Sequence, residues 1–211
     1  MALFLQIHPE DPQPRLIRRA VDLLREGALI VYPSDSGYNF GCQAGSLEAQ
    51  MQLRRIRQLD ERHLLALCCA DLAQAAQFGQ IPNAAFRLIR PLVPGPYTFI
   101  LRATREAPRR LQDPKRKTVG VRLPDHVIAR ALIAELGEPL ISASLILPGE
   151  EESLPDPFDI RERLEHQVQA VLDGGYLTHQ PSTILDLSSD EPVLIRQGAG
   201  RIPGLSPPEQ G

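Results

Sequence analysis

The chain has 211 residues, of which 43% are hydrophobic, and its formal net charge at pH 7 is −3. This length and apolar content suffice for one domain with a full hydrophobic core, so we predict a single domain over residues 1–211. No stretch approaches the ~20 apolar residues of a membrane span, and residues 1–12 lack the apolar run of a signal peptide. We therefore expect a soluble, cytoplasmic protein with no membrane partner.

The cysteines and histidines argue against a metal site. Cys42, Cys68 and Cys69 form no Cys-x-x-Cys pair and leave an odd count, so neither a disulfide framework nor a structural zinc site is indicated. The five histidines are scattered without i, i+4 spacing. We predict reduced cysteines in or near the core and no protein-bound metal.

Helix and strand patterns alternate in the first third of the chain. Residues 15–26 place apolar side chains on one helical face. Ser46 is a suitable N-cap for a helix over residues 46–57, and Asp71 can cap a short alanine-rich helix. Between these two helices, residues 64–68 have a strand pattern. Such alternation is typical of a sheet with helices packed on it.

A strand that ends in a hydroxyl-rich loop follows the first helix. Residues 28–32 are apolar and suit a buried strand, and Pro33 lacks the N–H that would extend a ladder. Ser34, Asp35 and Ser36 are therefore expected at a strand end, followed by a glycine-punctuated loop. Strand ends of this kind are where α/β folds place ligands.

The rest of the chain continues the same mixture of elements. The expected order is strands over 98–104 and 118–123, a helix over 127–136, a strand over 140–144, a helix over 159–168, and strands over 182–187 and 193–196. The segment from Gly198, including the proline-rich tail 201–211, is predicted to be loose. We predict an α/β fold, classed as α+β in some schemes, with three layers and a mixed sheet covered by helices.

Charge is unevenly distributed along the chain. Residues 102–122 carry eight lysines and arginines against two acidic residues, whereas residues 150–165 carry seven acidic residues against two arginines. The first span suits an anionic partner, and the second is typical of a solvated acidic face.

Four sets of polar residues are candidates for a nucleotide site, and each also has a structural explanation. Ser34 and Ser36 can donate to phosphate oxygens or can simply form a turn. The cluster Arg54, Arg55 and Arg57 can hold phosphate or carboxylate, or can stabilise the end of a helix.

The third and fourth sets lie in later strands. Arg122 interrupts an apolar strand and needs either a ligand or a carboxylate partner. Hydroxyl residues at strand ends, together with a nearby arginine, form the fourth set, although such residues also fill tight packing positions. Its members are Ser142, Ser144, Ser182, Thr183 and Arg196.

Common catalytic motifs are absent from the sequence. There is no phosphate-binding G-x-x-x-x-G-K-[ST] loop and no strand-linked G-x-G-x-x-G that opens a helix. The G-x-S-x-G motif is also missing, and no histidine is placed near Ser34 or Ser36, which disfavours a serine hydrolase.

Taken together, the candidate segments resemble the YrdC-like family of threonylcarbamoyl-AMP synthases, and most closely its YciO branch. The resemblance spans a core over about residues 14–200. The resemblance rests on seven segments: Gly27-Ala-Leu-Ile-Val-Tyr-Pro-Ser-Asp-Ser-Gly-Tyr, Arg54-Arg-Ile-Arg-Gln-Leu, Pro94-Gly-Pro-Tyr-Thr, Lys117-Thr-Val-Gly-Val-Arg-Leu-Pro, Ser142-Ala-Ser, Pro181-Ser-Thr and Leu194-Ile-Arg-Gln-Gly.

The resemblance implies a YrdC-like fold, with a twisted mixed sheet and a concave basic face. It also implies a reaction that joins threonine, bicarbonate and ATP into threonylcarbamoyl-adenylate and releases pyrophosphate, for the threonylcarbamoyl modification of tRNA adenosine. Mg²⁺ would arrive with ATP. Because the threonine carbamate itself attacks the α-phosphate, the site needs positioned anions and no protein nucleophile.

The resemblance also assigns roles to residues. Arg55 and Arg57 would act in catalysis. The residues around threonine would be Ser34, Ser36, Arg122, Ser142 and Ser182. Those around ATP would be Arg55, Arg57, Thr98, Thr118, Ser144 and Arg196. The proposed partners of Arg57 and Arg122 are thus ligands rather than core groups.

This chain departs from the family pattern at three points. Arg55 replaces the lysine of the K-x-R element, Gln58 replaces the proline after it, and Leu145-Ile146 replaces the Ala-Asn of S-x-S-A-N. Arginine and lysine are not equivalent at a geometrically strict site. We therefore expect weakened or altered ATP handling.

The alternative from a different class is a binding protein for double-stranded RNA or tRNA without efficient synthase activity. The basic span 102–122 and the missing asparagine favour it. The RNA-binding residues would be Arg109, Arg110, Lys115, Arg116 and Lys117. A small-anion-binding protein with neither role is the third possibility.

Overall fold

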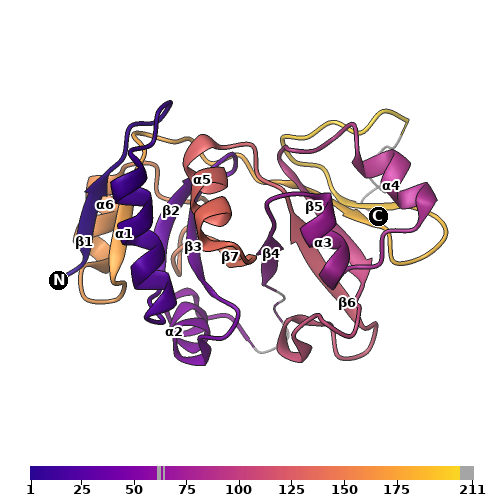
Figure 1. Ribbon diagram of the computed structural model, residues 1–211, viewed down its shortest axis with the longest axis horizontal. Helices are drawn as coiled ribbons and strands as arrows, with labels where there is room; N and C mark the ends of the chain where they lie inside the picture. Colours follow the sequence, from indigo (N-terminus) through magenta and orange to yellow (C-terminus); the bar gives the residue numbers. More distant parts are fainter. Residues whose placement is uncertain (61–62, 64, 205–211) are drawn as a thin grey trace.

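The computed structural model describes residues 1–60, 63 and 65–204, and these residues form one mixed sheet with helices packed on it (Figure 1). The strands are β1 (Leu3–Gln6), β2 (Ile30–Ser34), β3 (Gly37–Gln43), β4 (Ala66–Cys68), β5 (Tyr97–Arg102), β6 (Thr118–Arg122), β7 (Leu140–Ser144), β8 (Ala170–Asp173), β9 (Thr183–Asp186) and β10 (Val193–Arg196). The helices are α1 (Pro14–Arg25), α2 (Leu47–Arg57), α3 (Leu72–Phe78), α4 (Asn83–Ile89), α5 (Val127–Leu136), α6 (Pro157–Leu164) and the 3-10 helix η1 (Arg109–Leu111).

The sheet combines parallel and antiparallel pairs, which confirms the predicted mixed α/β fold. The strand order is β1-β8-β2-β3-β7-β4-β6-β5-β9-β10. Strands β2 and β3 form a hairpin, whereas β4 pairs parallel with β6 and antiparallel with β7. Strands that are far apart in the sequence therefore meet in the middle of the sheet.

Local sequence signals explain the bounds of the long helices. Helix α1 has Pro14 in its first turn, and Gly27, just beyond it, has a φ of +89°. Ser46 caps α2 by accepting a hydrogen bond from the backbone N–H of Ala49. Helix α5 ends at Gly137 in the left-handed conformation. These ends agree with the predicted helices within two residues.

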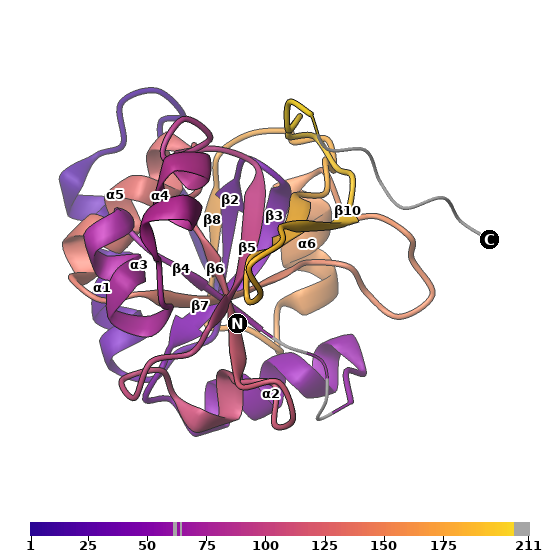
Figure 2. The same ribbon diagram turned by 90° about the vertical axis from the view of Figure 1, so that its right-hand side faces the viewer.

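Two hydrophobic clusters hold the helices on the sheet. Ile30, Tyr32 and Leu140 belong to a cluster with the buried faces of α1 and α5. Val31, Phe40 and other alternate residues of the strands belong to a larger cluster with side chains of α2, α3, α4 and α6. In Figure 2, α1, α3, α4 and α5 lie on one side of the sheet and α6 on the other. Alternate residues of each strand therefore face different environments.

Several predicted elements require correction. Residues 37–43, predicted as a loop, form the buried strand β3, and β1, β8 and α4 were not predicted. Strand β2 starts and ends two residues later than predicted and includes Pro33, whose missing N–H did not end it. Leu64, the first residue of the strand predicted over 64–68, lies outside the described residues.

The end of the chain is also better ordered than predicted, as far as it is described. Thr183 donates a hydrogen bond to the carbonyl of Gly200, and Tyr97 donates one to the carbonyl of Arg201 at 2.8 Å. Ile202 is buried in the larger cluster. The prediction of a loose segment from Gly198 is therefore wrong up to Ile202, because these residues pack against β5 and β9. Residues 205–211 of the predicted tail lie outside the described part.

Three further observations concern the cysteines, possible metal sites and membrane-spanning helices. Cys42, Cys68 and Cys69 are free and buried. Within residues 1–60, 63 and 65–204, no group of three or more His, Cys, Asp or Glu side chains is arranged to hold a metal ion. None of the helices in the described part has the length and apolar character needed to cross a bilayer.

Candidate functional site

The hydroxyl-rich segment is the turn of the β2–β3 hairpin. Ser34 pairs with Gly37, so Asp35 and Ser36 are the two turn residues, and Gly37 has a φ of +99°. The Ser34 hydroxyl lies 3.0 Å from that of Ser36 and accepts a hydrogen bond from the Ser36 backbone N–H. Both side chains are buried. The turn thus holds two hydroxyl groups and one carboxylate in fixed positions.

Arg122 reaches this turn from the end of β6. Its Nη2 lies 2.8 Å from Oδ1 of Asp35, and its Nη1 donates to the Ser36 hydroxyl at 3.0 Å. The other carboxylate oxygen of Asp35 accepts a hydrogen bond from the Asp125 backbone N–H. The Arg122 and Asp35 side chains are 6% and 9% exposed. Of the two kinds of partner that the sequence left open for Arg122, the carboxylate is confirmed, because Asp35 neutralises the guanidinium group.

A buried tyrosine supports the floor of the site. Tyr32 donates a hydrogen bond to the hydroxyl of Ser142 on β7 at 2.8 Å and lies 3.5 Å from the sulfur of Cys68. Burial raises the pKa of Tyr32 well above its ordinary value, so the phenol stays protonated and can act as donor. Because Tyr32 supplies the donor, the Ser142 hydroxyl is free to donate its own hydrogen to a ligand.

Residues of β5, β9 and β10 form the opposite wall. The hydroxyls of Thr98 and Ser182 lie 2.8 Å apart. Arg196 donates to the carbonyl of Ser182 from Nε at 3.1 Å and from Nη2 at 2.7 Å. Burial, followed by the charge of Arg122, lowers the pKa of Arg196 from its ordinary value. The contribution of Arg122 to this shift indicates that its charge acts on the Arg196 guanidinium group.

The end of α2 supplies a third arginine. Arg57 donates from Nη1 to the carbonyl of Ser144 at 2.7 Å, while its Nε is buried and has no hydrogen-bond partner. Burial lowers the pKa of Arg57 from its ordinary value. His63 follows at the rim, where burial and then the charges of Arg57 and Arg54 lower its pKa. Neutral His63 therefore adds no charge near pH 7.

These groups line one cleft of about 240 Å³ on the sheet. Among the described residues, its walls carry three arginines and four hydroxyl side chains, and no carboxylate lines it. The lining residues are Asn39, Arg57, His63, Ala66, Thr98, Arg122, Ser142, Ala143, Ser144, Ile146, Ser182, Ile184 and Arg196. Such a lining suits a small anionic ligand.

The structure brings together most of the predicted site residues. Seven of them line the cleft: Arg57, Thr98, Arg122, Ser142, Ser144, Ser182 and Arg196. Ser36 accepts a hydrogen bond from Arg122, and Ser34 contacts Ser36, but neither serine lines the cleft. Thr118 is buried at the start of β6 with an unpartnered hydroxyl, but it does not line the cleft. Arg55 is exposed on α2 and does not line it either.

Asn39 and His63 line the cleft but were not predicted. Asn39 was missed because residues 37–43 were taken for a loop, so the side chains that alternate along β3 were not assigned to a face. His63 follows α2 and could have been found only from its distance along the chain to Arg57. Both residues come from segments whose placement depends on distant parts of the chain.

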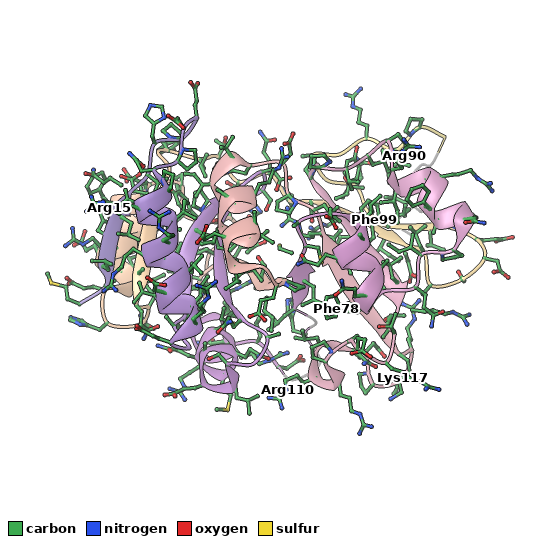
Figure 3. The ribbon with its side chains drawn as sticks, viewed as in Figure 1. Arg15, Phe78, Arg90, Phe99, Arg110 and Lys117 are labelled. Carbon is green, nitrogen blue, oxygen red and sulfur yellow. The ribbon has the colours of Figure 1, made fainter. Side chains whose placement is uncertain are left out.

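The five residues predicted to bind RNA lie elsewhere, on the connection between β5 and β6. All of them, Arg109, Arg110, Lys115, Arg116 and Lys117, are exposed. Figure 3 shows Arg110 and Lys117 on the lower edge of the molecule, away from Arg15 at the other end. A cavity of about 690 Å³ here is lined by Gln80, Ala103, Thr104, Arg105, Arg109, Gln112 and Lys117. It is larger than the cleft, but its three cations, Arg105, Arg109 and Lys117, are all exposed.

Comparisons with known proteins agree with this geometry. The family model Sua5_yciO_yrdC, described as telomere recombination, matches residues 22–198. The crystal structure of Escherichia coli YciO has a TM-score of 0.92 and 48% sequence identity, with 96% of this chain and 98% of that chain covered. That E. coli relative is described as uncharacterized.

Two more distant relatives carry functional names. A threonylcarbamoyl-AMP synthase of Bacillus subtilis is 30% identical over 198 residues, which cover 92% of this chain and 55% of that protein. The structure of P. abyssi Sua5 complexed with L-threonine has a TM-score of 0.85 and 28% identity, and covers 93% of this chain and 58% of that chain. This chain therefore spans little more than half the length of either protein.

Proposed function

The chain belongs to the Sua5/YciO/YrdC family, and we propose that its cleft performs synthesis of the threonylcarbamoyl-AMP type. In this reaction, threonine, bicarbonate and ATP give threonylcarbamoyl-adenylate and pyrophosphate. The observation that carries the proposal is the pair of buried, unpartnered Nε–H groups of Arg57 and Arg122, both from residues that line the cleft. Buried donors of this kind are rarely left without a partner in the functional state.

The available groups suit the chemistry. The threonine amine adds to the carbon of bicarbonate with loss of water, and a carbamate oxygen then attacks the α-phosphate and displaces pyrophosphate. Ser142 and Ser182 can donate to carboxylate or carbamate oxygens, while Arg57 and Arg196 can stabilise the charge that grows on phosphate. Mg²⁺ would arrive with ATP and would neutralise part of the charge of its phosphates.

The size of the cleft supports a division of the ligands. Its volume of about 240 Å³ is below the ~300 Å³ at which ligand pockets usually begin. A small amino acid fits into such a space, whereas the nucleotide would extend toward the rim formed by Arg57 and His63. Ile146 contributes an apolar side chain to the lining. This side chain, at the position of the family asparagine, is consistent with altered handling of ATP.

The test is a product assay. The protein is incubated with threonine, ¹³C-bicarbonate and Mg-ATP, and threonylcarbamoyl-adenylate and pyrophosphate are measured by mass spectrometry and a coupled assay. We expect labelled adenylate from the wild type, a loss of at least about tenfold in Arg57→Met, and unchanged activity in Arg87→Met, an exposed arginine of α4. Absence of labelled product under saturating substrates would refute the proposal.

A second candidate function, binding of double-stranded RNA or tRNA, rests on the exposed cations of the β5–β6 connection. Three of the seven residues around its 690 Å³ cavity are cationic and none is acidic. Binding to phosphate groups releases counterions, so affinity should fall steeply as salt is raised. Fluorescence anisotropy with a tRNA and with an RNA duplex, at salt concentrations from about 50 to about 200 mM, measures how the RNA affinity depends on salt. A salt-insensitive or undetectable interaction would remove this candidate.

A further inference from the structure

Asn39 is a polar residue on the floor of the cleft that nothing in the sequence analysis assigned. It lies in β3, where it is paired with Tyr32 of β2 and with Ser144 of β7. Its exposed fraction is 0%, yet its side chain lines the cleft together with Ser142 and Arg122. The side chain is therefore closed to bulk water and borders only the cleft, from which a ligand would have to approach it.

The hydrogen bonds of Asn39 fix the orientation of its amide. Nδ2 donates to the carbonyl of Gly37 at 2.9 Å and to the hydroxyl of Ser34 at 2.6 Å. Because a backbone carbonyl can only accept, the nitrogen must face Gly37. The other amide atom, Oδ1, is thereby turned away from the hairpin turn.

Oδ1 of Asn39 is buried and has no hydrogen-bond partner. A buried carbonyl oxygen without a donor destabilises a protein, so such atoms commonly mark a missing ligand or water. The neighbours of Asn39 differ in size: Tyr32, its partner on β2, is large, whereas Ser142 and Ala66 on the next two strands are small. Ser142 and Ala66 also line the cleft, so a ligand atom would approach Oδ1 from their side.

The missing partner must be a donor. Ionised carboxylate and phosphate oxygens are matched to the arginines and hydroxyls of the cleft, but they only accept and so cannot satisfy a carbonyl oxygen. An amine can, since each N–H donates. We propose that Oδ1 of Asn39 accepts a hydrogen bond from the amine of the bound amino acid, and that Asn39 thereby selects amino acids over acids that lack an amine. The identity of the ligand class rests on the proposed function.

This contact is compatible with the whole reaction. The free amine carries hydrogens beyond the lone pair that attacks bicarbonate, and one N–H remains on nitrogen in the carbamate and in the adenylate. Asn39 can therefore hold the same N–H before and after the carbon–nitrogen bond forms. Its role is to orient the nitrogen and to discriminate between ligands, and it transfers no proton.

The experiment compares two ligands and two variants by calorimetry. L-Threonine carries the amine, and 3-hydroxybutyrate is the matched acid without it. In Asn39→Ala, the affinity for threonine should fall about tenfold, as for loss of one charge-assisted hydrogen bond, and that for 3-hydroxybutyrate less than about twofold. The control is Asn83→Ala, the other asparagine of the chain, which is exposed at the start of α4 and should change neither affinity.

The possible outcomes separate this inference from the proposed function. A wild type that binds neither threonine nor 3-hydroxybutyrate refutes both. A wild type that binds threonine, with equal losses for the two ligands in Asn39→Ala, refutes only the role of Asn39. If Asn39→Ala does not fold, the role of Asn39 is tested in the wild type, by NMR of its labelled asparagine side chains. Threonine should shift the Asn39 amide signals and 3-hydroxybutyrate should not, and equal shifts from both would overturn the inference.

Discussion

The cleft and the β5–β6 connection are both rich in arginine, but they use it differently. In the cleft, Arg57 and Arg122 are held by a carbonyl and a carboxylate, and each keeps a buried N–H without a partner. On the connection, the exposed cations project into solvent, with Arg116 paired to Asp186. Buried and fixed arginines can recognise one ligand shape, whereas exposed ones attract any polyanion.

The largest expected effect concerns the ion pairs of the two regions. Asp35→Asn leaves the buried charge of Arg122 without its carboxylate, so we expect the free energy of unfolding to fall by about 3 kcal/mol. Arg116→Gln removes the corresponding pair on the connection. There the arginine is half exposed and Ser188 also donates to Asp186, so we expect a loss of about 1 kcal/mol or less. Urea denaturation of both variants measures the difference, and equal losses would contradict the distinction between the regions.

The next effect separates two arginines of one helix. Arg57 lines the cleft and Arg55 does not, although the family resemblance gives both a catalytic role. We expect Arg57→Met to weaken ATP binding at least about tenfold and Arg55→Met less than about threefold, because only the first removes a donor inside the cleft. Isothermal titration with a non-hydrolysable ATP analogue tests this order. A larger loss in Arg55→Met would show that the nucleotide extends over the outer face of α2.

A third prediction concerns the salt dependence of RNA binding. Lys115→Gln and Lys117→Gln should each lower the slope of log affinity against log salt by about 1, without change in threonine binding. Arg116→Gln should change the slope less, since Asp186 already neutralises much of its charge. Anisotropy titrations at several salt concentrations give the slopes. Identical slopes for all three variants would mean that the ion pair between Arg116 and Asp186 opens when RNA binds.

The sequence predicted the helices with clear end signals and several of the strands. The strands predicted over residues 118–123 and 140–144 both match the structure closely. Strand β3 was missed because Gly37, Asn39 and Gly41 are typical turn residues. Its stability depends on pairing with β2 and β7, and β7 is about a hundred residues away in the chain. At Gly41, an added Cβ would lie only 2.9 Å from the Tyr32 ring.

For the candidate site, the sequence identified chemical types better than contacts. Serines and arginines at strand ends were predicted, and most of them line one cleft. The partner of Arg122 could not be chosen between ligand and carboxylate, because Asp35 lies 87 positions away. Likewise, nothing local distinguishes Arg57 from Arg55. The direction of each side chain on α2 depends on how that helix packs against β3 and β7.

The smallest expected effect is a dependence of stability on pH that arises around the cleft and not on the connection. Burial is the largest cause that lowers the pKa of His63, His126 and His179, whereas residues 102–122 contain no histidine. Below their ordinary pKa of about 6.5, these side chains take up protons more readily in the unfolded chain than in the folded one. Stability should therefore be constant above about pH 7.5 and fall as the pH drops below 6.5.

His126 gives the cleanest test of this pH effect. Its Nδ1 is buried without a hydrogen-bond partner, so protonation in the folded state is opposed by burial even though Asp35 and Asp125 favour it. His126→Gln should reduce the fall in urea midpoint between pH 7 and pH 5, while His8→Gln, at an exposed position near the N-terminus, should leave it unchanged. An undiminished fall in His126→Gln would contradict a role for His126 and would leave His63 and His179, whose pKa values burial also lowers, as the histidines that set the pH dependence.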